Sequence, residues 1–105
     1  MPEFFPCPYF GDTVECTDER YAHILEGHSD LVLRYWERVA ETLAYPNRVF
    51  RSDQDLNGRV FIRWYDDLEK NILAVVISDA NGRHWLITAY MTRRMPKGEV
   101  LWLRS

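Results

Sequence analysis

Residues 17–31 read TDERYAHILEGHSDL and decide how the N-terminal part of the chain folds. Thr17 is a typical helix N-cap, two acidic residues follow it in the first turn, and Gly27 is a typical helix stop. Ser29 or Asp30 can then cap a second helix. The stretch therefore predicts two consecutive helices that meet around Gly27.

The second helix shows an apolar stripe at helical spacing and is closed by Tyr45 and Pro46. Beyond it the apolar period changes from 3.6 to 2, and β-branched and aromatic residues dominate. Strands are expected near residues 48–52, 59–65, 72–78 and 85–91. Residues 79–82, DANG, predict a tight turn between the last two strands, because Gly82 tolerates a positive φ.

These elements predict an α+β fold, in which two N-terminal helices pack on one face of a roughly four-stranded antiparallel sheet. The chain has 105 residues, which is near the usual size of one domain, and no internal repeat divides it. We therefore expect a single domain over residues 1–105. Three prolines among the first eight residues oppose regular structure, so residues 1–13 are expected to form an extended lead-in.

The charge distribution argues against a protein that grips nucleic acid over a wide surface. The formal net charge is −3; residues 1–45 carry three basic and nine acidic side chains, and residues 46–105 carry ten basic and seven acidic ones. The second half can thus hold a small local anion site. No apolar run approaches the ~20 residues that span a bilayer, and the start lacks a secretory signal. We expect a cytoplasmic protein without membrane contact.

The sequence carries no motif for a metal ion or a cofactor. It lacks a Gly-rich phosphate loop, a serine-nucleophile motif and a carboxylate cluster of metal-binding spacing, so neither kind of group is expected. Cys7 and Cys16 lack the CxxC spacing of a zinc site. We expect two free thiols there, with a disulfide as the alternative.

The strand at 59–65 alternates arginine with aromatic residues. If the helices cover the more apolar set of side chains, the open face of the sheet presents polar groups from two strands, namely Arg59, Arg63, His84, Thr88 and Tyr90. Such a face suits RNA, because guanidinium groups hold phosphate while aromatic rings stack on unpaired bases. The alternative is an ordinary half-solvated strand face.

Two histidines lie five positions apart on the first helix. His28 follows the apolar stripe to the end of the helix beside the core, whereas His23 lies about 100° from the centre of that stripe. An imidazole at this place can act as a general acid or base, and the alternative is a capping residue that bonds a free carbonyl. A spacing of five does not align two zinc ligands on a helix.

The C-terminal stretch LITAYMTRRMPKGEVLW places hydroxyl groups and cations close together. Thr88 and Tyr90 lie on the last predicted strand, and Arg93, Arg94 and Lys97 follow it. This group favours an anion such as phosphate, and the alternative is a polar strand end with a basic loop.

Five motifs resemble a known group of proteins. TDERYAHILEGHSDL, ETLAYPNRVFRS, VFIRWY, LAVVIS and HWLITAYMTRR are similar to the small phage and bacterial members of the barnase, EndoU, colicin and RelE-like ribonuclease superfamily (the BECR fold). The resemblance covers a nuclease-like body over residues 14–102. It implies a metal-independent endoribonuclease in which a ribose 2′-hydroxyl attacks the adjacent phosphate and leaves a 2′,3′-cyclic phosphate end.

The resemblance also implies roles for single residues. His23 and His28 match the helix histidines, Arg63 matches the strand arginine that clamps phosphate, and Thr88 and Tyr90 match the hydroxyls of the last strand. Secondary RNA contacts are expected from the surrounding cations and the third histidine, namely Arg59, His84, Arg93, Arg94 and Lys97. Small nucleases of this group often act as toxins, so a cognate protein inhibitor, or antitoxin, is an implied partner beside RNA, and the protein is expected to be a monomer or a small homo-oligomer.

Two features sit badly with this resemblance. The face argument puts Arg63, Thr88 and Tyr90 opposite the helices, so His28 has to come round a sheet edge to reach them. His84 shares their predicted face and is a rival base. The alternative function is a catalytically inactive module of the same fold that binds RNA or protein. A third hypothesis is a plain interaction domain whose exposed aromatic residues dock a partner, namely Phe4, Phe5, Tyr9 and Trp102.

Overall fold

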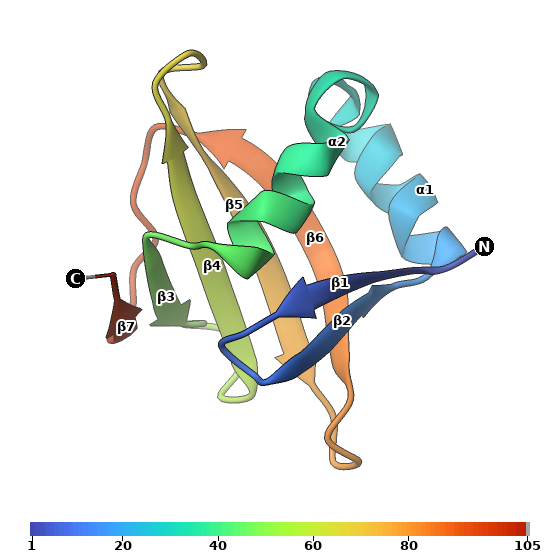
Figure 1. Cartoon of the computed structure of the whole chain (residues 1–105), viewed down its shortest axis with the longest axis vertical. Coiled ribbons are helices and arrows are strands. Elements are labelled where there is room, and N and C mark those ends of the chain that lie inside the picture. The colour runs from blue at the N-terminus through green and yellow to red at the C-terminus, as the bar shows by residue number, and fades with distance from the viewer. Residues whose placement is uncertain (105) are drawn as a thin grey trace.

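The two helices follow the sequence prediction closely. The computed structural model describes residues 1–104 (Figure 1). Helix α1 spans Asp18–Gly27, and the Thr17 hydroxyl caps it by accepting a hydrogen bond from a first-turn amide at 3.1 Å. Helix α2 spans Ser29–Ala44 and ends just before Pro46, whose ring cannot continue a helix. Both helices lie on the same side of the sheet.

The sheet is larger than predicted and is not purely antiparallel. It has seven strands in the order β1-β2-β6-β5-β4-β3-β7, and β2 pairs with β6 in parallel while the other pairs are antiparallel. The bounds are β1 Glu3–Cys7, β2 Asp12–Cys16, β3 Arg48–Arg51, β4 Gly58–Tyr65, β5 Lys70–Ser78, β6 His84–Thr92 and β7 Val100–Leu103. The prediction of about four antiparallel strands was therefore wrong in number and in direction. The four predicted strands correspond to β3–β6.

The N-terminal segment forms a β-hairpin and not the predicted extended lead-in. Strands β1 and β2 pair in antiparallel register, and Pro6 lies within β1. A proline lacks an N–H group, but β1 is an edge strand, so Pro6 needs a partner on one side only. The prolines thus do not prevent a strand here, because the strand lies at the edge.

Strand β7 is the second part of the sheet that the sequence did not predict, and it lies at the edge opposite to the β1–β2 hairpin (Figure 1). The chain reaches it from β6 through residues 93–99, which pass three strands of the sheet. The Arg51 amide donates to the Glu99 carbonyl at 2.8 Å, and Gly98 approaches the same strand closely with φ of 126°. A strand of four residues is too short to show a clear alternation, so the sequence did not predict it.

The helices cover the face of β4 that was expected to be open. Phe61 and Tyr65 are buried in the core that α1 and α2 share with the sheet, whereas Val60 and Ile62 belong to a smaller apolar cluster on the other face. Trp64 is 43% exposed. The predicted face assignment was therefore wrong for this strand. Burying the two large aromatic rings of Phe61 and Tyr65 against the helices stabilises the fold more than burying the smaller Val60 and Ile62 there, and it leaves the Trp64 indole exposed.

Strand β6 carries a β-bulge that breaks its alternation. Its register against β5 shifts between Val75 and Val76, so that Leu86 and Ala89 both enter the helix-side core. Thr88 pairs with Val75 and Tyr90 with Leu73, two residues of the other face. His84 lies beyond the bulge, and the prediction that it shares the face of Thr88 and Tyr90 was wrong, because the bulge adds one residue between them.

The C-terminal half of β6 has a free edge. Its parallel partner β2 pairs with it only at His84 and Trp85. Beyond Trp85 no strand among residues 1–104 covers that side of β6, and α1 lies beside it (Figure 1). The end of α1 is thus placed where a side chain can reach the rim of the sheet. No helix within residues 1–104 is long and apolar enough to cross a membrane.

Candidate functional site

The junction of α1 and α2 fixes the backbone of His28. The His28 amide donates to the Ile24 carbonyl at 2.7 Å, which closes α1, and the His28 carbonyl accepts from the Val32 amide at 3.2 Å, which opens α2. The residue lies between the helices with φ of −141°. His28, and not Ser29 or Asp30, is therefore the N-cap of α2. Its side chain makes no capping hydrogen bond, so only its backbone carbonyl bonds the first turn. The imidazole is left exposed.

The imidazole of His28 comes round the free edge of β6. Its ring lies 5.7 Å from the Tyr90 ring, centroid to centroid, with an interplanar angle of 28°. Tyr90 packs on the apolar cluster of the face away from the helices, so the stack joins the helical layer to that face. The sequence argument required this passage round an edge, and the sheet topology provides it.

A small open hollow brings both helix histidines to one place. It has a volume of about 200 Å³ and is lined by His23, Glu26, Gly27, His28 and Thr88. Neither imidazole donates or accepts a side-chain hydrogen bond within residues 1–104, so both are free to exchange protons with a ligand. Four of the five residues matched to nuclease roles, His23, His28, Thr88 and Tyr90, thus lie together at the β6 edge.

A second hollow flanks His28 and contains a cation that sequence reasoning missed. It has a volume of about 370 Å³, and its lining includes His28, Asp30, Met91 and Lys70. Lys70 opens β5 after the turn at Glu69, which has a positive φ of 52°. Little in the sequence indicated Lys70, because it comes near His28 only through the pairing of β5 with β6. That antiparallel pairing places the start of β5 beside the end of β6.

Arg63 does not lie at this site. Its Nη1 donates to the Tyr45 carbonyl at 2.6 Å, and its Nε lies 3.8 Å from the Glu41 carboxylate, which is an ion-pair distance too long for a hydrogen bond. These partners belong to the C-terminal end of α2, whereas His28 precedes the first residue of that helix, and α2 is kinked at Tyr35 between the two ends. The structure therefore does not bring the expected phosphate clamp to His28.

Arg63 instead belongs to a cluster around Tyr65. The Tyr65 hydroxyl donates to the Glu41 carboxylate at 2.7 Å, and Arg38 forms two hydrogen bonds of 2.8 Å to Asp67. Burial raises the pKa of the Tyr65 phenol to about 12, and the neighbouring Glu41 carboxylate adds to the shift. The cluster's charges largely pair with one another, so it ties α2 to β4.

His84 lies at the other end of β6 and is already engaged. Its Nδ1 lies 2.6 Å from the Ser78 hydroxyl, and its ring stacks on Phe10 with centroids 3.8 Å apart. From His84 to Tyr90 the strand extends by roughly 20 Å. His84 is thus held in a packed environment remote from His28.

The remaining predicted cations divide between the two ends of the sheet. Arg59 bonds the Leu56 and Gly58 carbonyls near the start of β4, far from the β6 edge. Arg93 donates to the Glu69 carbonyl at 3.2 Å and therefore lies next to Lys70. Arg94 and Lys97 are exposed in the connection that follows β6. Only Arg93 of this group is tied to the end of the sheet that carries His28.

The β6 edge offers two imidazoles, a threonine, a phenol and a nearby amine. Such groups can accept a proton, donate a proton and hold an anion. Within residues 1–104 no three side chains of the kinds His, Cys, Asp and Glu are grouped to hold a metal ion. Cys7 and Cys16 are free and buried in the core, which confirms the prediction of two free thiols. No protein-family model, curated protein or solved structure matches the chain.

Proposed function

We propose that the protein is a metal-independent endoribonuclease whose active site lies at the free edge of β6. The observation that carries the proposal is the meeting of His23, His28 and Thr88 in one hollow, with the His28 ring stacked on Tyr90. Two exposed imidazoles at one place suit a reaction with two proton transfers. The resemblance of five sequence motifs to those of the BECR ribonucleases favours the same activity.

The reaction follows from these groups. One imidazole accepts the proton of a ribose 2′-hydroxyl, and the 2′-oxygen forms a bond to the adjacent phosphorus. The other imidazole donates a proton to the 5′-oxygen as the bond between that oxygen and phosphorus breaks. The products are a 2′,3′-cyclic phosphate end and a 5′-hydroxyl end. Each proton-transfer group contributes roughly 10²- to 10⁴-fold to the rate.

The crowded phosphorane needs positive charge beside it. Lys70 lines the hollow that flanks His28, and Arg93 is bonded to the residue before Lys70. We assign to Lys70 the role of phosphate clamp that the resemblance gave to Arg63, and to Arg93 a supporting contact. Thr88 and Tyr90 orient the substrate and the imidazole.

Incubation of the purified protein with total RNA in excess EDTA tests the proposal. Wild type is compared with His23→Ala, His28→Ala and, as the matched control, His84→Ala. We expect new ends with 2′,3′-cyclic phosphate in wild type and His84→Ala, and at least 10²-fold less cleavage when either helix histidine is removed. Intact RNA with every protein would contradict the proposal and favour the inactive RNA- or protein-binding module.

A toxin-like role belongs to the same proposal. Small nucleases that cut cellular RNA stop growth unless a protein inhibitor blocks the site. We expect expression of the wild-type protein to arrest growth, and expression of His28→Ala to be tolerated. Growth arrest that persists in His28→Ala would assign the toxicity to something other than cleavage at the β6 edge.

A further inference from the structure

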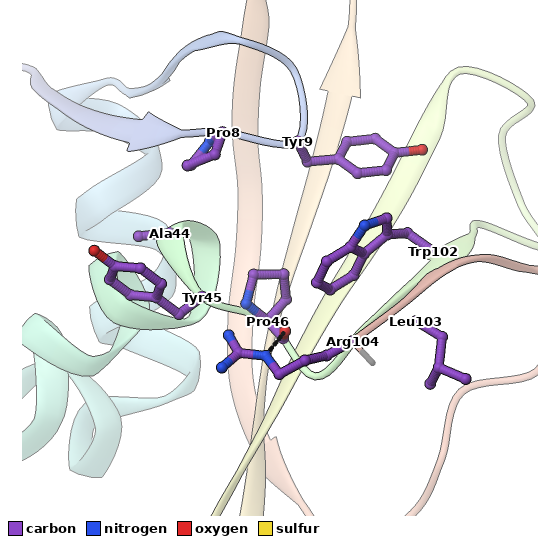
Figure 2. Close-up of a pocket in the computed structure, with 8 residues that line it drawn as sticks. All are labelled: Pro8, Tyr9, Ala44, Tyr45, Pro46, Trp102, Leu103 and Arg104. Atoms are coloured by element: carbon purple, nitrogen blue, oxygen red, sulfur yellow. Dashed lines mark hydrogen bonds between the residues drawn. The ribbon is translucent and has the colours of Figure 1, made fainter.

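A hollow of about 630 Å³ lies at the end of α2 opposite to His28 (Figure 2). It is formed by the β1–β2 hairpin, the residues that follow α2 and strand β7. Its side chains are mostly aromatic rings and prolines, with one arginine: Pro8, Tyr9, Tyr45, Pro46, Trp102 and Arg104. In Figure 2 the indole of Trp102 and the ring of Tyr9 lie on one side, Tyr45 lies on the other, and Pro46 and Arg104 lie between them.

Trp102 differs from the other tryptophans of the chain. The indole Nε1 groups of Trp36, Trp64 and Trp85 each donate to a carboxylate, at 2.7 to 3.0 Å. The Nε1 group of Trp102 has no hydrogen-bond partner within residues 1–104, and the residue is 39% exposed. The groove therefore presents a free donor beside a flat apolar surface.

Arg104 adds a cation to this groove. Its Nε donates to the Pro46 carbonyl at 3.2 Å, which leaves the two terminal nitrogens of the guanidinium for another acceptor. No carboxylate lines the groove, and within residues 1–104 Arg104 forms no ion pair. A planar cation next to exposed rings matches a ligand that is both anionic and aromatic.

We infer that this groove binds an unpaired nucleotide of an RNA strand. The base stacks on the face of the Trp102 indole, a phosphate lies at the guanidinium of Arg104, and the Nε1 group, which points outward in the plane of the ring, is left for an oxygen of the sugar–phosphate backbone. Stacking of bases on aromatic rings combined with arginine contacts to phosphate is the usual way in which proteins hold single-stranded RNA. A proline-rich peptide also fits aromatic grooves, but its backbone requires no cation. The positive charge of Arg104 therefore favours the nucleotide.

The groove is not the cleavage site. It lies at the C-terminal end of α2, whereas His28 precedes the first residue of that helix, and none of its lining residues lines either hollow at His28. A nucleotide bound here belongs to the same strand at a distance from the cleaved bond, so the groove holds the substrate and does not take part in proton transfer. The inference rests on the proposed ribonuclease function. Its test measures RNA binding and not RNA cleavage, so the two can succeed or fail independently.

A non-cleavable RNA probe separates binding at the groove from cleavage at the β6 edge. A 2′-O-methyl RNA octamer of mixed sequence lacks the attacking hydroxyl, and its binding is followed through the four indole N–H resonances of the ¹⁵N-labelled protein. The Trp102 resonance is identified by its loss in Trp102→Phe. We expect the octamer to shift this resonance and to leave those of Trp36, Trp64 and Trp85 in place, because their N–H groups are already bonded.

Variants measure how much each group contributes. We expect Trp102→Ala to weaken octamer binding about tenfold or more, and Trp64→Ala, an indole of similar exposure on the other face of the sheet, to leave it unchanged. Arg104→Ala should lower the slope of log K against log salt by about 0.7 for a single strand. His28→Ala should bind the octamer as wild type does. The backbone amide spectrum of each variant reports whether it is folded.

Two outcomes overturn the inference. One is a Trp102 resonance that the octamer does not move in folded wild-type protein. The other is a Trp102 resonance that shifts with a decaproline peptide and not with RNA, which would assign the groove to a proline-rich partner. Either result leaves the EDTA cleavage test of the proposed function unaffected, and loss of cleavage in that test leaves the octamer measurement unaffected.

Discussion

The imidazole of His28 stacks on the phenol ring of Tyr90, with the two ring centroids 5.7 Å apart. His28 comes from the α1–α2 junction and Tyr90 from the far face of β6, so the stack crosses the rim of the sheet. An aromatic pair of this kind contributes about 0.5–1.5 kcal/mol beyond the area that it buries. The ring of Tyr90 therefore orients an imidazole whose backbone is already fixed by both helices.

Replacement of Tyr90 tests whether its ring or its hydroxyl matters. We expect Tyr90→Phe to leave the Cε1–H proton resonance of His28 in place and to retain most cleavage, because the stack survives. Tyr90→Ala should shift that resonance and lower RNA cleavage about tenfold, because a misplaced catalytic group loses rate steeply. NMR of the three histidines, assigned with His28→Ala, checks the stack without any activity assay. An unmoved His28 resonance in Tyr90→Ala would contradict this role.

The proposed function gives the role of phosphate clamp to Lys70 and not to Arg63. We expect Lys70→Ala to lower RNA cleavage about 10²-fold, because it removes the cation nearest to the proposed phosphate position, and Lys70→Arg to restore much of it. Arg63→Ala should leave the cleavage rate within about threefold in samples shown to be folded, because Arg63 is bonded at the far end of α2. The opposite pattern, with loss only in Arg63→Ala, would move the active site to the Tyr65 cluster.

The Tyr65 hydroxyl contributes to stability and not to the proposed chemistry. It is buried and donates to Glu41 at 2.7 Å. We expect Tyr65→Phe to lower the free energy of unfolding by about 1–2 kcal/mol, because Glu41 and the Thr42 hydroxyl lose a partner. The matched control is Tyr45→Phe, since the Tyr45 ring is 61% exposed, and it should change stability by no more than about 0.5 kcal/mol. Urea denaturation measures both, and equal effects would contradict the assignment.

The two buried thiols are expected to be unreactive in the folded protein. Burial raises the pKa of Cys7 and of Cys16 to about 11, so at pH 8 only about one molecule in a thousand carries the reactive thiolate at either position. Iodoacetamide should label both slowly at pH 8, and quickly once urea unfolds the chain. Rapid labelling of the folded protein would show that the thiols are more accessible than the structure has them.

The same shift gives a direction for the pH dependence of stability. The pKa of each thiol is higher in the folded protein than the ordinary value of 9.0, so the folded state holds the protons more tightly. The contribution to the free energy of unfolding is complete below pH 9 and is lost as the pH rises through about 11. Denaturation midpoints measured from pH 8 to pH 11 should fall, and they should fall less in the double variant Cys7→Ala, Cys16→Ala.

Gly98 ties β7 to β3. A Cβ atom at this position would lie 2.5 Å from the Arg51 carbonyl oxygen, and φ is 126°, a conformation that other residues rarely adopt. We expect Gly98→Ala to destabilise the protein and to loosen β7, seen as faster hydrogen exchange of the β7 amides. Gly27→Ala is the matched control, because a Cβ atom there meets nothing within 4 Å. Slow exchange at β7 in Gly98→Ala would contradict this.

Local signals were enough for the helices and for the central strands. The Thr17 cap, the Gly27 stop and the proline after α2 act within a few residues, and so does the DANG turn, in which Asp79 accepts from the amides of Asn81 and Arg83. The hydrogen bonds from Trp85 and from these amides lower the pKa of Asp79 below its ordinary value. Features of this kind are predicted correctly because both partners are close in sequence.

The edge strands and the site depended on contacts distant in sequence. The sequence by itself determined that His23, His28, Thr88 and Tyr90 were candidates, because imidazoles can transfer protons, hydroxyls favour an anion, and the motifs around them resemble those of a ribonuclease superfamily. Only the tertiary structure decided that β2 pairs with β6 for two residues and leaves the rest of that edge open, that a bulge turns His84 away, and that Lys70 and not Arg63 lies beside His28. Strand order, bulges and the choice of buried face depend on total packing of the sheet against both helices, and no local stretch of residues encodes that packing.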